Sequence, residues 1–156
     1  MRTVLFLSLM FSVLAAIAMD SFRLYVNERY GYSISYPVDF IPQGVSDAGD
    51  GQAFVSAKGD AKLLVFASTC REGSGAYAAD YVTGYKQEQK LGTLAITYSR
   101  KSNNVAVVSG HKNGRIFYNK MLVDGDWCTQ FNFEHDEVMS KKYNAITKHI
   151  SSSFKR

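Results

Sequence analysis

Residues 116–133 decide the fold: Ile-Phe-Tyr-Asn-Lys-Met-Leu-Val-Asp-Gly-Asp-Trp-Cys-Thr-Gln-Phe-Asn-Phe. Residues 116–123 have strand character, 124–126 form a Gly-containing turn, and 127–133 alternate along a second strand. The side chains expected on one face of that second strand are Trp127, Thr129, Phe131 and Phe133. Two extended runs joined by a short turn predict an antiparallel hairpin. We therefore expect an antiparallel sheet at the centre of the fold.

Shorter runs of strand character lie on both sides of this hairpin. They cover residues 22–26, 32–37, 53–57, 62–67, 94–98 and 105–108. In the first run Phe22, Leu24 and Val26 alternate with polar residues and Tyr, which predicts that they face the core. The continuous apolar run 62–67 predicts a central strand covered on both faces.

A helix is predicted over residues 75–90. Ser74 precedes it as an N-cap, and Gly92 lies just beyond its end as a stop signal. Its tyrosines recur at helical spacing, at positions 77, 81 and 85. We expect them to pack against the sheet with their hydroxyls at the rim.

A second helix closes the chain, with Asp136 predicted as its cap. The apolar residues expected on its inner face are Met139, Tyr143, Ile146 and Ile150. Strands, a helix, further strands and a final helix predict an α+β domain with a mainly antiparallel sheet and helices laid over it.

The composition fits one folded domain. The chain has 156 residues, of which 46% are hydrophobic and 13% aromatic, so it can form a packed core and is not a disordered chain. The net charge is +4, without any run of basic residues. We therefore expect no nucleic-acid partner.

Residues 1–18 have the pattern of a secretory signal peptide. Arg2 precedes an apolar run over residues 4–14, and Ala16-Ile17-Ala18 matches an A-x-A cleavage sequence. The alternative is an uncleaved membrane anchor, for which the run is short. We expect residues 1–18 to be removed and residues 19–156 to form a single periplasmic domain without stable membrane insertion.

Export changes the interpretation of the two cysteines. Cys70 and Cys128 make an even count, and an oxidising compartment allows them to form a disulfide. The alternative is two separate buried thiols. We predict the disulfide; neither cysteine has a second Cys or a His at the spacing of a metal site.

Residues with catalytic potential form no motif. His111, His135 and His149 lie at a predicted turn, at a strand end and in the closing helix, and we expect all three at the surface. No serine completes the G-x-S-x-G sequence of a nucleophile elbow. We predict no catalytic residue, no metal site and no cofactor, and hence a protein that is not an enzyme.

Two acidic loops are the candidate surface for a protein partner. Residues 37–52 form the longest predicted loop, which contains both prolines and carries Asp47 and Asp50. Residues 124–127 add Asp124, Asp126 and Trp127. A Trp with acidic neighbours is a suitable anchor for a basic partner, although Trp127 is also on the predicted core face.

Acidic residues leave a cation site open at two places. Asp47-Ala48-Gly49-Asp50-Gly51 has the carboxylates and glycines of a calcium loop but not the spacing of an EF-hand, and it also fits an Asx-rich turn. Glu134, Asp136 and Glu137 fit either a cation site or charges at a helix N-terminus.

Four phrases follow one another along the chain. They are Asn-Glu-Arg-Tyr-Gly-Tyr-Ser-Ile-Ser-Tyr-Pro at 27–37, Gly-Asp-Gly-Gln-Ala-Phe at 49–54, Val-Ser-Gly-His-Lys-Asn-Gly-Arg-Ile-Phe-Tyr-Asn-Lys at 108–120, and a closing pattern of Tyr143, Ile146, Ile150 and Ser153-Phe154. Together they resemble a group of small, exported, largely uncharacterised bacterial proteins with a PsbP-like fold. The extrinsic PsbP subunit of photosystem II, an import factor that binds the Ran GTPase and some immunity proteins against secreted toxins share that fold. The resemblance implies an α/β/α sandwich and binding rather than catalysis.

Three hypotheses for function follow. The first is an exported protein-binding module, in its sharpest form an immunity protein that neutralises a secreted bacterial toxin. The second is an accessory or assembly subunit of an envelope complex. The third is an envelope hydrolase, which lacks a nucleophile–base pair in the sequence.

Overall fold

The computed structural model describes residues 21–70 and 74–156, with side chains in the middle helix from Tyr77 onward. The elements in chain order are β1 Phe22–Asn27, β2 Tyr32–Pro37, β3 Phe40–Val45, β4 Gly51–Ser56, β5 Ala61–Thr69, α2 Ser74–Lys90, β6 Ala95–Lys101, β7 Val105–Lys112, β8 Arg115–Asp124, β9 Trp127–Asp136, the 3-10 turn η1 Glu137–Met139 and α3 Ser140–Ser153. The predicted signal peptide lies outside the described residues. None of the helices described is long and apolar enough to cross a membrane.

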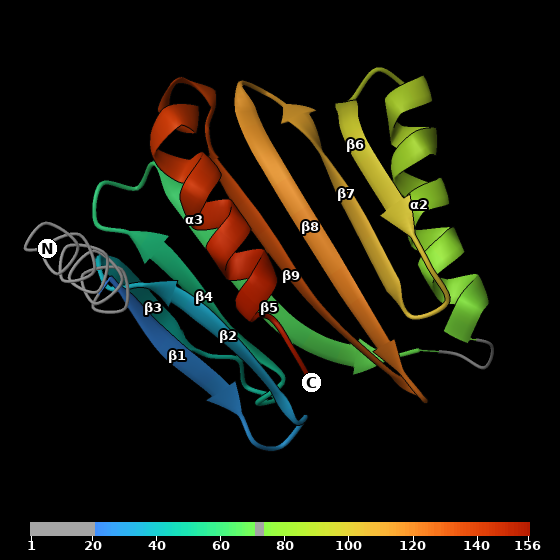
Figure 1. The fold of residues 1–156 in the computed structure, drawn as a ribbon, viewed down its shortest axis with the longest axis horizontal. Coiled ribbons are helices and arrows are strands. Elements are labelled where there is room, and N and C mark those ends of the chain that lie inside the picture. Colours follow the sequence, from blue (N-terminus) through green and yellow to red (C-terminus); the bar gives the residue numbers. More distant parts are fainter. Residues whose placement is uncertain (1–20, 71–73) are drawn as a thin grey trace, which may run out of the picture.

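The strands form one large antiparallel sheet and one small hairpin. The seven-stranded sheet has the order β3-β4-β5-β9-β8-β7-β6, and β1 and β2 pair separately. Figure 1 shows α3 and the β1–β2 hairpin over the half of the sheet that contains β3, β4, β5 and β9, and α2 beside β6 and β7. The predicted α+β class and sandwich architecture are confirmed.

Alternation along the central strands divides the apolar residues between two cores. Phe131 and Phe133 of β9 pack under α3 and the β1–β2 hairpin, in a core that also holds Tyr32, Phe54 and Tyr143. The other side chains of β8 and β9 face α2. That second core contains Cys70, Ala78, Val82, Leu94, Ala106, Val108, Phe117, Met121, Val123 and Cys128.

Helix α2 packs through its tyrosines, as predicted, but the Tyr81 hydroxyl is buried rather than at the rim. Tyr77, Tyr81 and Tyr85 are partly buried against the second core. The Tyr85 hydroxyl accepts a hydrogen bond of 2.6 Å from the buried amide of Asn119, and its ring stacks on Phe117. Burial raises the pKa of Tyr81 far above its ordinary value. The predicted Ser74 cap involves a side chain outside the described residues, whereas Gly92 ends the helix with a φ of 74°.

The predicted loop 37–52 is wrong, because residues 40–45 form strand β3. This strand lies at the edge of the sheet and contains Pro42, and its register with β4 shifts between Pro42 and Val45. An edge strand tolerates proline because one of its sides has no neighbouring strand to hydrogen-bond. The proline and glycines of this segment therefore predicted a loop where the structure has a strand, and the connecting loop is residues 46–50.

The face predicted to be buried in β1 is also wrong. Leu24 and Val26 are 62% and 51% exposed, whereas Tyr25 packs against the core. The cause is pairing with β2, since Tyr25 lies opposite Ile34, which faces the core. Similarly, β5 is not covered evenly on both faces: Leu63 and Val65 are fully buried, but Leu64 is only partly buried.

The predicted surface position of His135 is wrong, and Asp136 lies at the N-cap position of η1 without capping it through its side chain. His135 is 1% exposed and stacks on Tyr143, with ring centroids 5.0 Å apart. Asp136 makes no capping hydrogen bond and instead binds Arg115 at 2.7 Å. His111 and His149 are at the surface as predicted, where they contact Glu137 and Phe22 respectively.

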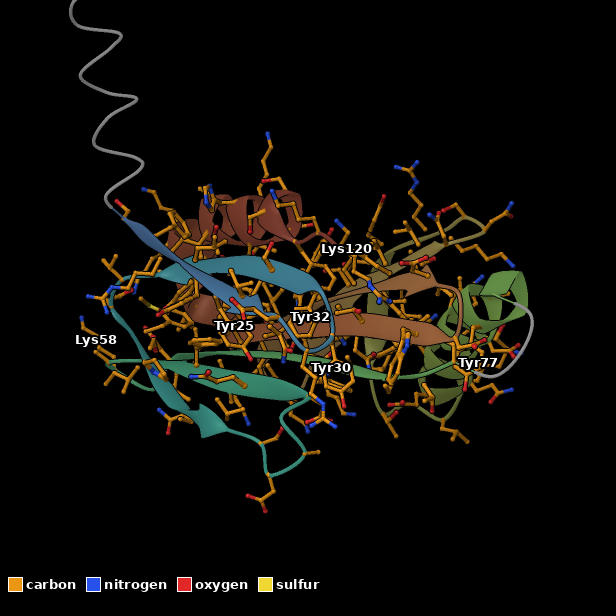
Figure 2. All side chains as sticks on the ribbon, turned by 90° about the horizontal axis from the view of Figure 1, so that it is seen from below. Tyr25, Tyr30, Tyr32, Lys58, Tyr77 and Lys120 are labelled. Carbon is orange, nitrogen blue, oxygen red and sulfur yellow. A yellow bond between two sulfur atoms is a disulfide. The ribbon has the colours of Figure 1, made fainter. Side chains whose placement is uncertain are left out.

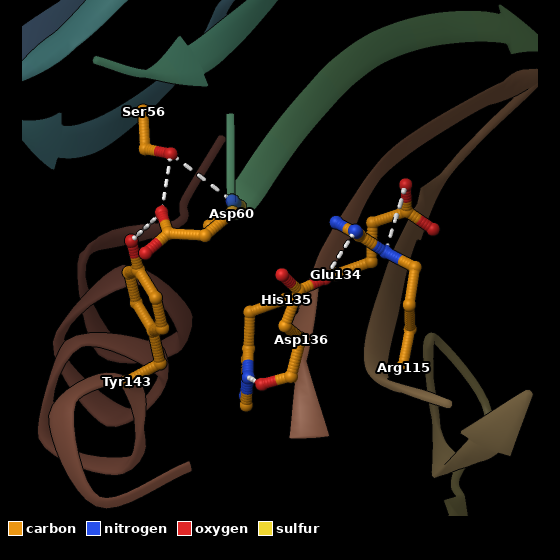
Figure 3. Close-up of polar contacts among 8 residues, drawn as sticks. Ser56, Asp60, Arg115, Glu134, His135, Asp136 and Tyr143 are labelled. Carbon is orange, nitrogen blue, oxygen red and sulfur yellow. Dashed lines mark hydrogen bonds and ion pairs between the residues drawn. The ribbon is translucent and has the colours of Figure 1, made fainter. Parts of the chain in front are cut away.

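A polar network fixes α3 to the β4–β5 turn (Figure 3). The Ser56 and Tyr143 hydroxyls each donate a hydrogen bond of 2.6 Å to the carboxylate of Asp60. Lys142 donates to the Tyr143 hydroxyl at 3.0 Å. The hydrogen bonds from Ser56 and Tyr143 lower the pKa of Asp60 below its ordinary value. Folding therefore favours the ionised form of this carboxyl group.

Cys70 and Cys128 form a disulfide, with Cα atoms 5.3 Å apart and 58 residues of separation. It links the chain segment before α2 to the central strand β9.

We expect the Cys70→Ala/Cys128→Ala variant to have a free energy of unfolding in urea that is lower by about 3–5 kcal/mol, because the unfolded chain gains conformational entropy when the loop is no longer closed. Reductant should lower the stability of the wild-type protein by a similar amount and leave the variant unchanged. Two reactive thiols in denatured, unreduced protein would contradict the bond.

We expect Tyr143→Phe to lose about 1.5 kcal/mol of stability at neutral pH, because it removes a hydrogen bond to a charged group. The loss should shrink as pH falls through the lowered pKa of Asp60, because protonation abolishes the charge-assisted bond. Urea unfolding at neutral pH and below about pH 4 measures this. Tyr118→Phe is the matched control, since Tyr118 bonds the neutral hydroxyl of Ser151. A loss from Tyr143→Phe that does not depend on pH would count against the network.

Candidate functional site

The structure brings the two predicted acidic loops to one end of the sheet. The turn of the β1–β2 hairpin connects them. Arg29 in this turn donates a hydrogen bond of 2.7 Å to the carbonyl of Ala48 in the β3–β4 loop. Next to it, Tyr30 packs edge-on against Trp127 at the start of β9, with ring centroids 5.1 Å apart. We call the surface formed by residues 28–31, 46–50 and 124–127 the aromatic end; Figure 2 labels Tyr30 within it.

Trp127 is the most exposed member of its predicted strand face. Thr129, Phe131 and Phe133 are fully buried as expected, but Trp127 is 38% exposed. It is the first residue of β9 and pairs with Thr69 at the end of β5. The adjacent disulfide at Cys128 and the hydrogen bond from the Cys70 amide to the Asp126 carbonyl hold this turn in place.

The β3–β4 loop is a closed polar turn. The Ser46 hydroxyl bonds the Asp50 carboxylate and also accepts from the Asp50 and Gly51 amides. Tyr32 donates to the Asp50 carbonyl at 2.8 Å, which ties the loop to β2. Asp47 is exposed. Within the described part of the chain, no group of three acidic, His or Cys side chains is placed to hold a metal ion.

The acidic residues of the β8–β9 turn are also at the surface. Asp124 and Asp126 are exposed, and the Asp124 carboxylate lies 3.7 Å from the guanidinium of Arg156. The C-terminal residues thus reach the aromatic end, where Lys155 pairs with Ser33 of β2. Of the acidic residues beyond this turn, Glu134 and Asp136 contact Arg115, and Glu137 contacts His111.

A second candidate site is a groove of about 420 Å³ between α2 and the sheet, which we call the polar groove. Leu64 and Phe117 provide apolar surface from β5 and β8, and Tyr85 and Glu88 line it from α2. Asn132 of β9 also lines the groove and lies directly opposite Asn119 of β8. The side-chain carbonyl oxygen of Asn132 is buried and has no hydrogen-bond partner among the described residues.

Four of the five charged residues that line the polar groove form ion pairs with one another. Lys112 lies 3.3 Å from Glu88, and Arg115 lies 3.6 Å from Glu134 (Figure 3). Lys62 is directly opposite Glu134 on the neighbouring strand. No Ser, Cys or His is among the described residues that line the groove. The groove therefore offers polar contacts to a ligand.

The Ser56–Asp60–Tyr143 network does not supply a nucleophile either. Ser56 is buried, and its hydroxyl already donates to Asp60 and accepts from the Ala61 amide. Ser56 does not line the polar groove. These hydrogen bonds give Ser56 a structural role in the β4–β5 turn.

Sequence reasoning missed Arg29 and Tyr30 as members of the aromatic end. They lie in the turn of a hairpin, and only the tertiary structure places that turn beside Trp127. The sequence contained one signal for this turn, Tyr30-Gly31-Tyr32. Gly31 adopts a positive φ of 66°, a conformation that glycine favours, and it ends the turn that contains Tyr30.

No protein-family model matches the sequence, and the search of curated proteins gave no match. The structure, in contrast, is similar to solved structures. Cyanobacterial PsbP (CyanoP) from Synechocystis sp. PCC 6803 superposes with a TM-score of 0.62 at 15% identity, over 86% of this chain and 92% of that protein.

Two further structures are similar at lower scores. A protein from Bacteroides thetaiotaomicron VPI-5482 matches with a TM-score of 0.50 at 10% identity, over 86% of this chain and 48% of that one. The protein of unknown function PA94 from Pseudomonas aeruginosa matches with a TM-score of 0.45 at 8% identity, over 81% and 91% of the two chains. The similarity to cyanobacterial PsbP extends over nearly the whole described domain, and the chain therefore has a PsbP-like fold.

Proposed function

We propose that the chain is an exported binding protein without catalytic activity, which recognises a protein partner through the aromatic end. The observation that carries the proposal is the contact between Tyr30 and Trp127, two aromatic side chains from distant parts of the chain that meet at the surface. Tyr, Trp and Arg are the residues that contribute most to protein interfaces. Arg29 lies over the Tyr30 ring at 5.3 Å and completes such a set.

The aromatic end is rigid, which favours binding. The disulfide, the Ser46 turn and the hydrogen bonds of Asn27 to Gly49 and Tyr32 fix the three segments relative to one another. A surface that is already ordered loses little conformational entropy when a partner binds. The exposed carboxylates of Asp47, Asp124 and Asp126 surround the aromatic pair and favour a partner with a basic rim.

In its sharpest form the proposed function is immunity against a secreted bacterial toxin, since a small, rigid, disulfide-linked domain suits an inhibitor. The PsbP-like fold supports a second candidate, an accessory subunit of an envelope complex, because PsbP is itself an extrinsic subunit. The two candidates differ in the partner. A single secreted enzyme recovered in stoichiometric amount supports immunity, and a resident membrane complex supports the accessory role.

We expect Trp127→Ala to abolish recovery of the partner from periplasmic extract and to weaken the purified complex by about 30-fold or more, as for a hot-spot residue worth about 2 kcal/mol. Tyr30→Ala should act in the same direction. Val138→Ala is the matched control, because Val138 is an exposed apolar residue on η1, outside the aromatic end. Equal partner recovery by the wild-type protein and Trp127→Ala, with both folded by circular dichroism, would refute the proposed surface.

Export is tested separately by intact mass spectrometry of the periplasmic fraction. We expect a chain that begins at Met19 and is two hydrogens lighter than its reduced form, because the signal peptide is removed and Cys70 is bonded to Cys128. A full-length chain held in the membrane fraction would contradict cleavage and favour the anchor.

A further inference from the structure

Helix α3 leaves part of its own face of the sheet uncovered. It packs against β2, β9 and β8, and neither of the two described α-helices lies above β6 and β7 on this face. Two hollows of about 450 and 320 Å³ lie here, and both are lined by Tyr118, Lys120 and Ser151. They form one elongated groove between α3 and the outer strands, which we call the cationic groove. Figure 2 shows Lys120 on the α3 side of the sheet.

Every charged residue that lines the cationic groove is positive. Arg100 comes from β6, Lys120 from β8 and Lys148 from α3, and no Asp or Glu is among the lining residues. None of these three cations forms an ion pair within residues 21–70 and 74–156. The polar groove on the opposite face differs, because its lining includes Glu88 and Glu134, which contact Lys112 and Arg115.

Lys120 is held in the floor of the groove. Its ammonium donates a hydrogen bond of 2.8 Å to the Ser151 carbonyl and lies 6.0 Å from the centre of the Phe154 ring. Burial without a neighbouring carboxylate lowers its pKa. An ammonium has three donors, so this group retains the capacity to bind an anion.

The strand register fixes the spacing of the binding groups. Arg100 and Lys120 both lie opposite Val107, one on each side of it. Neighbouring strands are about 4.8 Å apart, so the two cationic residues have Cα atoms roughly 10 Å apart across an apolar centre. Val107 is buried, and Leu122 and Val105 extend this apolar floor.

We infer that the cationic groove is a binding site for an acidic, extended segment of a protein partner. The groove suits an extended chain because it is long, because apolar residues separate its cations, and because β6 at its rim is an edge strand. A flat membrane surface would not reach Lys120 in the floor, and three cations are few for a nucleic acid. The site shares no residue with the aromatic end and goes beyond the function proposed there.

The test uses the full mature protein and a fluorescent peptide of alternating Glu and Val, with a peptide of alternating Gln and Val as the ligand control. Fluorescence anisotropy at low salt should give saturable binding of the Glu peptide, and physiological salt should weaken it. Arg100→Gln/Lys120→Gln should weaken binding about tenfold, as expected for the loss of two partly exposed ion pairs. Lys58→Gln/Lys86→Gln removes the same charge from exposed sites outside the groove and should change binding less than twofold.

Arg100→Gln alone keeps the test decisive if the double variant unfolds, because Arg100 is exposed and forms no hydrogen bond or ion pair among the described residues. It should weaken binding about threefold. Equal weakening by the groove and control variants would show a net-charge effect and overturn the site. Absence of binding at peptide concentrations of about 1 mM, equal affinity for the Gln peptide, or binding only to phosphatidylglycerol vesicles would also overturn it.

Discussion

The β8–β9 hairpin is the constraint on which the rest of the structure depends. The two strands pair along their whole length, from Arg115 opposite Asp136 to Asp124 opposite Trp127. Because side chains alternate along each strand, this single register assigns Phe131 and Phe133 to one core and Phe117, Met121 and Cys128 to the other. A shift of one residue would exchange the faces, separating Cys128 from Cys70 and burying charged Glu134 under α3.

Much of this architecture could be predicted from the sequence, and the failures have physical causes. The hairpin at 116–133 and both helices were predictable because their patterns are long and local. Strand β3 was not, since an edge strand has one unpaired side and accepts residues such as Pro42 that normally mark loops. In β1 both faces carry apolar residues, so only pairing with β2 could decide that Tyr25, and not Leu24, faces the core.

Long-range contacts determine the remaining features that the sequence did not predict. His135 is buried because Tyr143, from the closing helix, stacks on it, and no local pattern reports that contact. The two candidate loops were predicted separately, and Trp127 and its acidic neighbours belong to the second of them. Their meeting at one end depends on Tyr30 and Arg29, which come from a hairpin far away in sequence. The sequence thus indicated residue types suited to recognition, whereas only tertiary structure assembles them into one surface.

The placement of the helices determines where recognition surfaces can form. Seven strands are too wide for one helix to cover, and α2 and α3 lie on opposite faces toward opposite sides of the sheet. Two areas diagonally opposite each other therefore stay open, one beside each helix. In the polar groove two of the three cations are paired, as Lys112–Glu88 and Arg115–Glu134. In the cationic groove Arg100, Lys120 and Lys148 have no carboxylate among the described residues, which suits the groove to an anionic ligand.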